Sequence, residues 1–395
     1  MNLKPFRKAF GNEEIAGVQR VISYYKKSKI DPPYSGIFEK ELSKKFSKYM
    51  NGGYSKAVAT GTSASFVAIQ SLQLDKDNEI LVSAVNDSGP FNSIIALGLK
   101  PKLIDSSKKN YNASLEEIKK RISKKTKACL IAHIGGRSTE IYKIKKFLKI
   151  KKIKLIEDFS QAPGAECYEC KVRCKGCIKK KVGEFGDVSF VSTMYRKSIS
   201  SGGSGGLIFT KDKKIYKKIL AYSDRGKKIW SNNINLNDPS KALFPGLNHN
   251  TNEFTCAITT ASLSRLNKNN FDRRKILQYL IKKMKPLQIC SPSEFNNGFA
   301  PFFFPIYVDE KKLKCSKSKF VNQLIKKGIG LLPEYNCIIS KWKWADRYLS
   351  DKYICKNAIS ISKKSFNLFI NENYNKKIID EIIRIITLTE KQYKI

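Results

Sequence analysis

The stretch 155–161 constrains the fold of this chain most strongly, because two aliphatic residues lead directly into an acid and an amide. The aliphatic pair is typical of a buried strand, and Asp158 and Gln161 follow where that strand ends. Open α/β sheets bind ligands outside the carboxyl ends of their strands. A second feature points to the same edge, since Lys197 follows another predicted strand and precedes a turn rich in glycine and serine, 200–206.

An acid and an amine at neighbouring strand ends suit pyridoxal phosphate (PLP). The ring nitrogen of PLP must stay protonated to act as an electron sink, which requires a carboxylate such as Asp158. The PLP aldehyde forms a Schiff base with a lysine such as Lys197. An ordinary α/β enzyme with exposed lysines is the competing interpretation of these two features alone.

Strands and helices alternate with short connections over the first two thirds of the sequence. We expect strands at 80–84, 101–105, 128–133 and 206–210, and helices at 13–27, 36–50, 115–124, 141–148 and 213–222. Such alternation predicts an α/β fold whose mostly parallel central sheet has helices on both faces.

The segment 57–65 reads as a strand, a glycine-containing turn and the start of a helix. Hydroxyl groups at Thr62 and Ser63 fit a phosphate cradle at that helix N-terminus. An ordinary helix cap is the alternative, because threonine and serine are favoured there in any case.

The pattern changes near residue 271 to a long basic helix, an apolar strand at 302–308, and helices at 320–327 and 376–388. These elements predict a small C-terminal α+β domain. We therefore expect three parts, namely an N-terminal arm, a large PLP-binding domain and the small domain, at 1–35, 36–265 and 266–395.

The formal net charge of +41 raises nucleic acid as a partner. The lysines, however, are spread along the whole chain, as expected for solvated helix faces in a proteome rich in lysine, isoleucine and asparagine. We favour that interpretation over nucleic-acid binding. No run of about 18 apolar residues occurs, and the first residues lack the apolar core of a signal peptide, which predicts a cytoplasmic protein without a membrane span.

Four of the ten cysteines lie close together, at Cys167, Cys170, Cys174 and Cys177. Two Cys-x-x-Cys pairs at this spacing can supply four thiolates to one tetrahedral site, and neighbouring lysine and arginine residues would offset their charge. Structural zinc, an iron–sulfur cluster and unligated thiols all remain possible interpretations of this stretch.

The order of these segments resembles the DegT-type (DnrJ/StrS-like) sugar aminotransferases, PLP enzymes of fold type I that act on nucleotide-linked keto sugars. The resemblance covers nearly the whole chain, and its motifs lie at 36–39, 61–64, 133–135, 157–165, 186–187, 192–206, 246–248 and 357–358.

The resemblance implies a role for each motif residue. Lys197 would form the Schiff base and move protons, and Asp158 would keep the ring nitrogen protonated. Gln161 would meet the ring hydroxyl. The phosphate would be bound by Thr62, Ser63 and Ser192, while Asn248 would reach into the partner subunit's site in a homodimer. Glutamate or glutamine would donate the amino group to a nucleotide-linked keto sugar, and products of this kind mostly enter surface polysaccharides.

The sequence also departs from the family pattern. An aromatic residue usually stacks on the PLP ring near Asn86 and Asp87, a position that Phe91 could fill if the loop is offset. The family tends to carry an arginine where this chain has Asn250. The cysteine-rich insertion, 166–182, replaces a short hairpin and is expected to lie close to the entrance of the active site.

Two alternative functions remain. Related sugar 3-dehydratases pair this fold with an iron–sulfur centre, but they replace the lysine with histidine. A regulatory or scaffolding member would keep the fold without catalysis, which the intact set of Asp158, Gln161 and Lys197 argues against.

Overall fold

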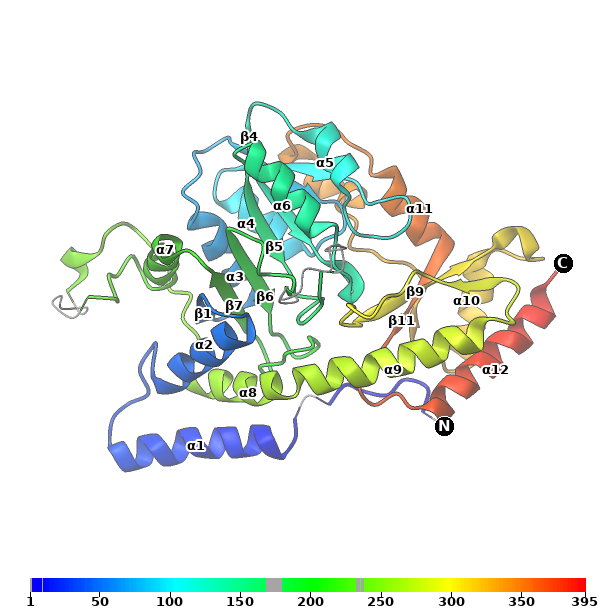
Figure 1. The fold of residues 1–395 in the computed structure, drawn as a ribbon, viewed down its shortest axis with the longest axis horizontal. Coiled ribbons are helices and arrows are strands. Elements are labelled where there is room, and N and C mark those ends of the chain that lie inside the picture. The colour runs from blue at the N-terminus through cyan, green and yellow to red at the C-terminus, as the bar shows by residue number, and fades with distance from the viewer. Residues whose placement is uncertain (1, 9, 168–179, 232–234, 236–237) are drawn as a thin grey trace, which may run out of the picture.

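The computed structural model describes residues 2–8, 10–167, 180–231, 235 and 238–395. Within these residues, the chain forms two sheets surrounded by helices (Figure 1). The first part of the chain contains helices α1 Asn12–Ser28, α2 Ile37–Tyr49, α3 Gly61–Gln70, α4 Ser88–Ala96, α5 Leu115–Arg121, α6 Ile141–Ile150, α7 Lys213–Ser223 and α8 Glu253–Ser264. The remainder contains α9 Leu266–Met284, α10 Lys317–Lys326, α11 Lys356–Lys364 and α12 Lys376–Tyr393.

The larger sheet has seven strands among the described residues, in the order β1-β7-β6-β5-β4-β2-β3. Only β7 runs against its neighbours, so the prediction of a mostly parallel sheet is confirmed. The strands are β1 Tyr54–Val58, β2 Glu79–Ser83, β3 Lys100–Ile104, β4 Thr126–Ala132, β5 Lys154–Asp158, β6 Val188–Ser192 and β7 Gly206–Thr210.

Both faces of the large sheet are covered, as strand β2 illustrates. Alternate side chains of a strand point to opposite faces. Val82 packs into one apolar cluster with helices α3, α4 and α7, and its neighbour Leu81 packs into another with α5 and α6. A strand that is buried on both faces is mostly apolar, which explains the run Ile80, Leu81 and Val82 between Glu79 and Ser83.

The smaller sheet is antiparallel, with strand order β10-β11-β9-β8. Its core contains side chains of α9, α10 and α12, which lie beside it in Figure 1. The strands are β8 Cys290–Pro292, β9 Phe303–Val308, β10 Leu331–Leu332 and β11 Ser365–Phe369.

The two ends of the chain cross the domain boundaries expected from the sequence. Leu3, in the expected N-terminal arm, belongs to the core of the small sheet, and the amide of Asn371 donates to the carbonyl oxygen of Pro5. Conversely, Ile338 and Ala358 of the expected small domain pack into the core of the large sheet. The division at residues 35 and 265 stays a prediction.

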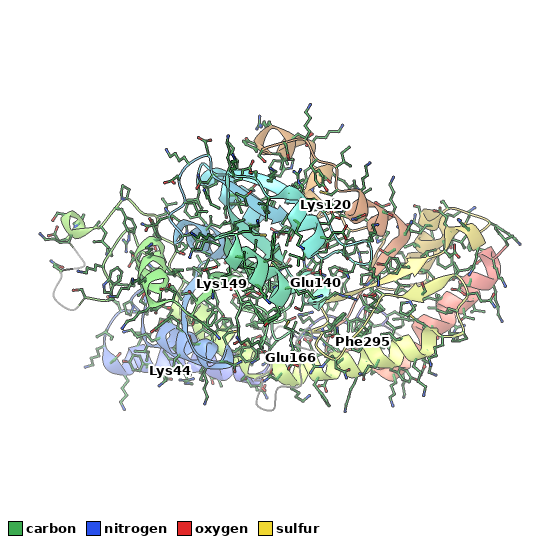
Figure 2. All side chains as sticks on the ribbon, turned by 45° about the horizontal axis from the view of Figure 1, so that its top comes forward. Lys44, Lys120, Glu140, Lys149, Glu166 and Phe295 are labelled. Atoms are coloured by element: carbon green, nitrogen blue, oxygen red, sulfur yellow. The ribbon has the colours of Figure 1, made fainter. Side chains whose placement is uncertain are left out.

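The lysine side chains follow the expected pattern at several helix surfaces. Lys44, Lys120 and Lys149 are exposed on α2, α5 and α6, and they are labelled in Figure 2. Among the described residues, we find no helix that combines the length and the apolar character of a membrane span.

Candidate active site

A cavity of about 190 Å³ opens at the carboxyl edge of the large sheet. Strands β2, β4, β5 and β6 run parallel, so their carboxyl ends meet at this edge. Five of the residues expected from the sequence line the cavity together, namely Thr62, Asp158, Gln161, Ser192 and Lys197. Ser63 and Asn248 do not line it.

Asp158 is the last residue of β5, and its side chain is almost completely buried. Its Oδ1 accepts a hydrogen bond of 2.9 Å from the backbone N–H of Ser160. Burial raises the pKa of Asp158, while the hydrogen bonds from Ser160 and the positive charge of Lys197 act in the opposite direction. A cation placed against this carboxylate would stabilise its ionised form.

Lys197 lies in the loop between β6 and β7, with its Nζ 5.5 Å from the centre of the Phe302 ring. Burial lowers the pKa of Lys197, and the carboxylates of Asp158 and Asp87 partly offset this effect. Because a lysine attacks a carbonyl only when it is deprotonated, the lowered pKa makes this amine a better nucleophile near neutral pH.

The N-terminus of helix α3 opens on the same cavity through Gly61 and Thr62. A Cβ atom at Gly61 would lie 2.5 Å from Cβ of Ser192, so only glycine fits here without movement of the neighbouring strand end. The cap is Thr60, whose Oγ1 accepts the N–H of Ser63 at 2.8 Å. The backbone N–H of Ser63 therefore takes part in the cap of helix α3.

Gln161 is held at both ends of its amide. Its Oε1 accepts the backbone N–H of Gly135 at 3.0 Å, and its Nε2 donates to the hydroxyl of Tyr335 at 2.7 Å. The side chain still lines the cavity, so its second Nε2 hydrogen is available to a ligand there.

Glu157 and His133 form a buried pair beside the cavity, which His133 lines. Nε2 of His133 lies 3.0 Å from Oε2 of Glu157, while Nδ1 accepts the N–H of Thr139. The proton of the neutral ring is therefore on Nε2, facing the carboxylate. Glu157 also accepts the N–H groups of Gly183 and Phe185, each at 2.8 Å, which fixes the chain after the cysteine-rich insertion.

The chemistry of this donor set fits PLP. The cavity combines a buried carboxylate at Asp158, an amine of lowered pKa at Lys197, an amide at Gln161, and a helix N-terminus whose glycine leaves room beside Ser192. These groups suit a pyridinium nitrogen, an aldehyde, a ring hydroxyl and a phosphate, in that order.

Comparison with known proteins agrees with this chemistry. The model of the DegT/DnrJ/EryC1/StrS aminotransferase family matches residues 17–387. The chain belongs to this family. The resemblance recognised from the motifs is thereby confirmed, and with it the expectation of an aminotransferase family.

Individual relatives extend the family match. GDP-perosamine synthase from Escherichia coli O157:H7 is 28% identical over 206 residues, and the alignment covers 51% of this chain and 54% of that protein, about half the length of each. The structure of an aminotransferase from Psychrobacter cryohalolentis has a TM-score of 0.87 at 19% identity, with 98% of this chain and 99% of that chain covered.

A dehydratase is also similar. The structure of E. coli GDP-4-keto-6-deoxy-D-mannose-3-dehydratase with bound hydrated PLP has a TM-score of 0.83 at 22% identity, and 98% of each chain is covered. These structures confirm the predicted PLP fold type I. At such identities they show the fold alone.

Phe91 does not take the place of the aromatic residue that stacks on PLP in the DegT/DnrJ/EryC1/StrS family. Its ring is fully buried and packs edge to face against Trp342 and Trp344, and it does not line the cavity. The polar residues Asn86 and Asp87 line the cavity instead.

Asn250, at the position where the resemblance led us to expect an arginine, contacts a buried lysine. Lys56, in β1, is buried and donates to Glu39 at 2.8 Å, to Ser35 at 2.8 Å and to Oδ1 of Asn250 at 3.2 Å. Asn250 is therefore held by a buried lysine of β1 that is paired with Glu39. Asn250 in turn donates to Oδ1 of Asn248 through its backbone N–H and its Nδ2.

The predicted metal ligands Cys170, Cys174 and Cys177 lie outside the described residues. Cys167 is described, and its backbone N–H donates to the carbonyl oxygen of Lys180 at the base of the insertion. Among the residues that the structure does describe, no group of three or more potential ligands could hold a metal ion.

Sequence reasoning did not single out several residues around the cavity. Asp87 and Ser160 follow strand ends, so their position after the strands could have indicated them. Tyr335 gave no such signal, because it is 174 positions from Gln161 and only the tertiary fold brings the two together.

Proposed function

We propose that this chain is a PLP-dependent aminotransferase that transfers an amino group from glutamate or glutamine to a nucleotide-linked keto sugar. The observation that carries the proposal is the placement of Lys197 and Asp158 in one cavity beside the N-terminus of α3. Membership of the DegT/DnrJ/EryC1/StrS aminotransferase family and the name of the GDP-perosamine synthase relative support the substrate class.

Bound PLP would supply an electron sink for the carbon that loses or gains the amino group. The protein residues have separate tasks around it. Asp158 would hold a proton on the ring nitrogen, and Gln161 would donate to the ring hydroxyl. Thr62 and Ser192 would bind the phosphate with the N-terminus of α3, and Ser63 would contribute through the cap of that helix.

Lys197 would be the covalent attachment point and the acid and base of the reaction. Its lowered pKa lets it accept a proton near neutral pH, and the nearby carboxylates of Asp158 and Asp87 stabilise it once it is protonated. The Phe302 ring, with its centre 5.5 Å from Nζ, is an apolar neighbour of the amine.

We further propose a homodimer with shared active sites. Asn248 is exposed and lies outside the cavity of its own chain, as expected for a residue that reaches a partner's site. The exposed apolar side chains Ile15 and Ile22 of α1 and Leu247 next to Asn248 are candidates for cover by the second subunit.

Three expectations stay predictions from the sequence: the cytoplasmic location, the structural metal at the four cysteines, and a role in surface polysaccharide synthesis. Dehydration is the second candidate function, because a relative named GDP-4-keto-6-deoxy-D-mannose 3-dehydratase is 24% identical over 372 residues. The lysine at position 197 favours transamination over it.

The test is a visible spectrum of the purified protein with PLP, before and after addition of glutamate, with metal analysis of the same sample. An absorption band of the PLP–lysine imine that bleaches as 2-oxoglutarate appears would support the aminotransferase. Iron–sulfur absorption without glutamate turnover would favour the dehydratase.

A further inference from the structure

Tyr335 connects the cofactor cavity to the C-terminal part of the chain. Its hydroxyl accepts a hydrogen bond of 2.7 Å from Nε2 of Gln161 and also interacts with the thiol of Cys337. Gln161 lines the cavity, whereas Tyr335 lies behind it, 8% exposed. Any effect of Tyr335 on a ligand is therefore indirect, through Gln161 or through the Cys337 thiol.

The hydrogen-bond partners of Gln161 leave only one orientation for its amide. The N–H of Gly135 is a donor and requires the amide oxygen, which it meets at 3.0 Å. The Tyr335 hydroxyl accepts from the amide nitrogen on the other side. If the amide were flipped, two donors would face each other at Gly135, and the N–H of Gly135 would lose its acceptor.

Tyr335 is itself fixed from several directions. Its backbone N–H donates to Oγ of Ser362 at 3.1 Å, and that hydroxyl donates back to its carbonyl oxygen at 3.3 Å. Its ring packs against Tyr111 and Phe303, with centres 5.4 Å and 4.9 Å away. A side chain held this firmly can impose an orientation on its neighbour.

The segment that follows Tyr335 is also tied to the large sheet. The N–H of Asn86 donates to the carbonyl oxygen of Cys337, and the N–H of Ile339 donates to that of Ala84. The segment therefore does not move independently of the cavity wall.

We propose that Tyr335 is a positioning residue of the cofactor site, which orients the Gln161 amide so that its second Nε2 hydrogen faces the cavity and is donated to the ring hydroxyl oxygen of PLP. This inference rests on the proposed function. It adds a residue of the C-terminal part to a site otherwise built on the large sheet.

The experiment titrates the long-wavelength absorption of the PLP-loaded full-length protein with pH, which reports the pKa of the PLP–lysine imine. A donor on the ring oxygen withdraws the oxygen's charge from the neighbouring imine proton and so lowers that pKa. Tyr335→Phe should weaken the donor and raise the imine pKa by about one unit, the scale of one hydrogen bond to a charged group. The titratable groups that face Lys197 are Asp158, Asp87, Cys337 and Arg7. Of these, the Cys337 thiol also meets the Tyr335 hydroxyl, and the Gln161→Ala background accounts for any effect that passes through it.

Tyr111→Phe is the matched control. Tyr111 packs on Tyr335 and is just as buried, but its hydroxyl meets Ser365 and not Gln161. It should leave the imine pKa unchanged. A merely structural role of Tyr335 would make the two variants alike.

The Gln161→Ala background separates positioning from any direct effect. Tyr335→Phe should add nothing once Gln161 is absent, and an undiminished shift in the double variant would overturn the inference. Gln161→Glu, which changes a cavity-facing side chain and keeps its shape, is the second test if Tyr335→Phe fails to fold. It should raise the imine pKa at least as much, and a wild-type titration would count against the proposal.

The outcomes distinguish the two proposals. If the wild type forms the imine band and Tyr335→Phe titrates as the wild type does, the positioning role is wrong and the proposed function stands. If the wild type forms no band with PLP, the proposed function fails and the inference fails with it.

Discussion

The buried ion pair between Lys56 and Glu39 should be essential to the stability of this fold. Nζ of Lys56 lies 2.8 Å from Oε2 of Glu39, and the two side chains are 2% and 6% exposed. Lys45 and Glu41 offer a comparison on the same helix, α2, because they are as close, at 2.7 Å, but 53% and 27% exposed. The two pairs differ chiefly in burial, although Lys56 lies on β1 and also bonds Ser35 and Asn250.

The expected magnitudes follow from that difference. Lys56→Met removes one partner of a buried pair and leaves the Glu39 carboxylate without its cation, which costs about 3–5 kcal/mol of unfolding free energy. Lys45→Met removes one partner of an exposed pair four residues apart on a helix, which costs about 0.5 kcal/mol or less. Lys56→Met combined with Glu39→Gln should recover much of the loss, because no unpaired charge remains buried.

Urea denaturation followed by tryptophan fluorescence measures these effects as shifts of the unfolding midpoint. A further variant tests the relation to Asn250 directly. The double variant Lys56→Met with Asn250→Arg supplies a positive charge from position 250 in place of Lys56. It should be more stable than Lys56→Met alone. If Lys56→Met shifts the midpoint no more than Lys45→Met does, the reasoning from burial is refuted.

Three further predictions concern the site. Asp87→Asn should lower the pKa of Lys197 further, because the Asp87 carboxylate raises that pKa. Imine formation with added PLP should therefore reach half its maximal rate at a lower pH than in the wild type. An unchanged pH profile would contradict this. The Lys197→Ala and Asn248→Ala variants should each be inactive alone. If Asn248 acts in the partner's site, dimers that combine one subunit of each variant should recover activity. No recovery after subunit exchange would argue against shared sites. If the four cysteines hold structural zinc, metal analysis should find about one equivalent of zinc per chain. A chelator should then lower the unfolding midpoint without abolishing the imine band. The Cys170→Ser variant should neither bind zinc nor respond to the chelator.

Several elements were predictable because their signals are local. The neighbouring aliphatic residues Leu155 and Ile156 in β5 indicate a strand buried on both faces, and a strand of that kind needs helices on either side. Helix α1 was expected within one residue at each end, because its apolar residues repeat at helical spacing. The long basic helix was expected from residue 271 but begins at Leu266.

Helix α8 was missed, as were α11 and the strands β8, β10 and β11. The sequence of α8 is rich in threonine and has no clear polar face, so local preferences did not indicate a helix. Tertiary packing against α1 and α2 buries most of its residues and stabilises it. Strand β10 is only two residues long and exists because it pairs with β11.

The sequence by itself determined the fold class, the family and the chemistry of the cavity, because acid, amide, lysine and glycine-rich turn occupy fixed places relative to predicted strand ends. The tertiary structure alone decided which groups hold those residues in place. Gln161 meets Tyr335, and Asn250 meets Lys56, across 174 and 194 positions of chain. Such partners depend on how distant segments of the chain pack together. Neither periodicity nor local propensity indicates that packing.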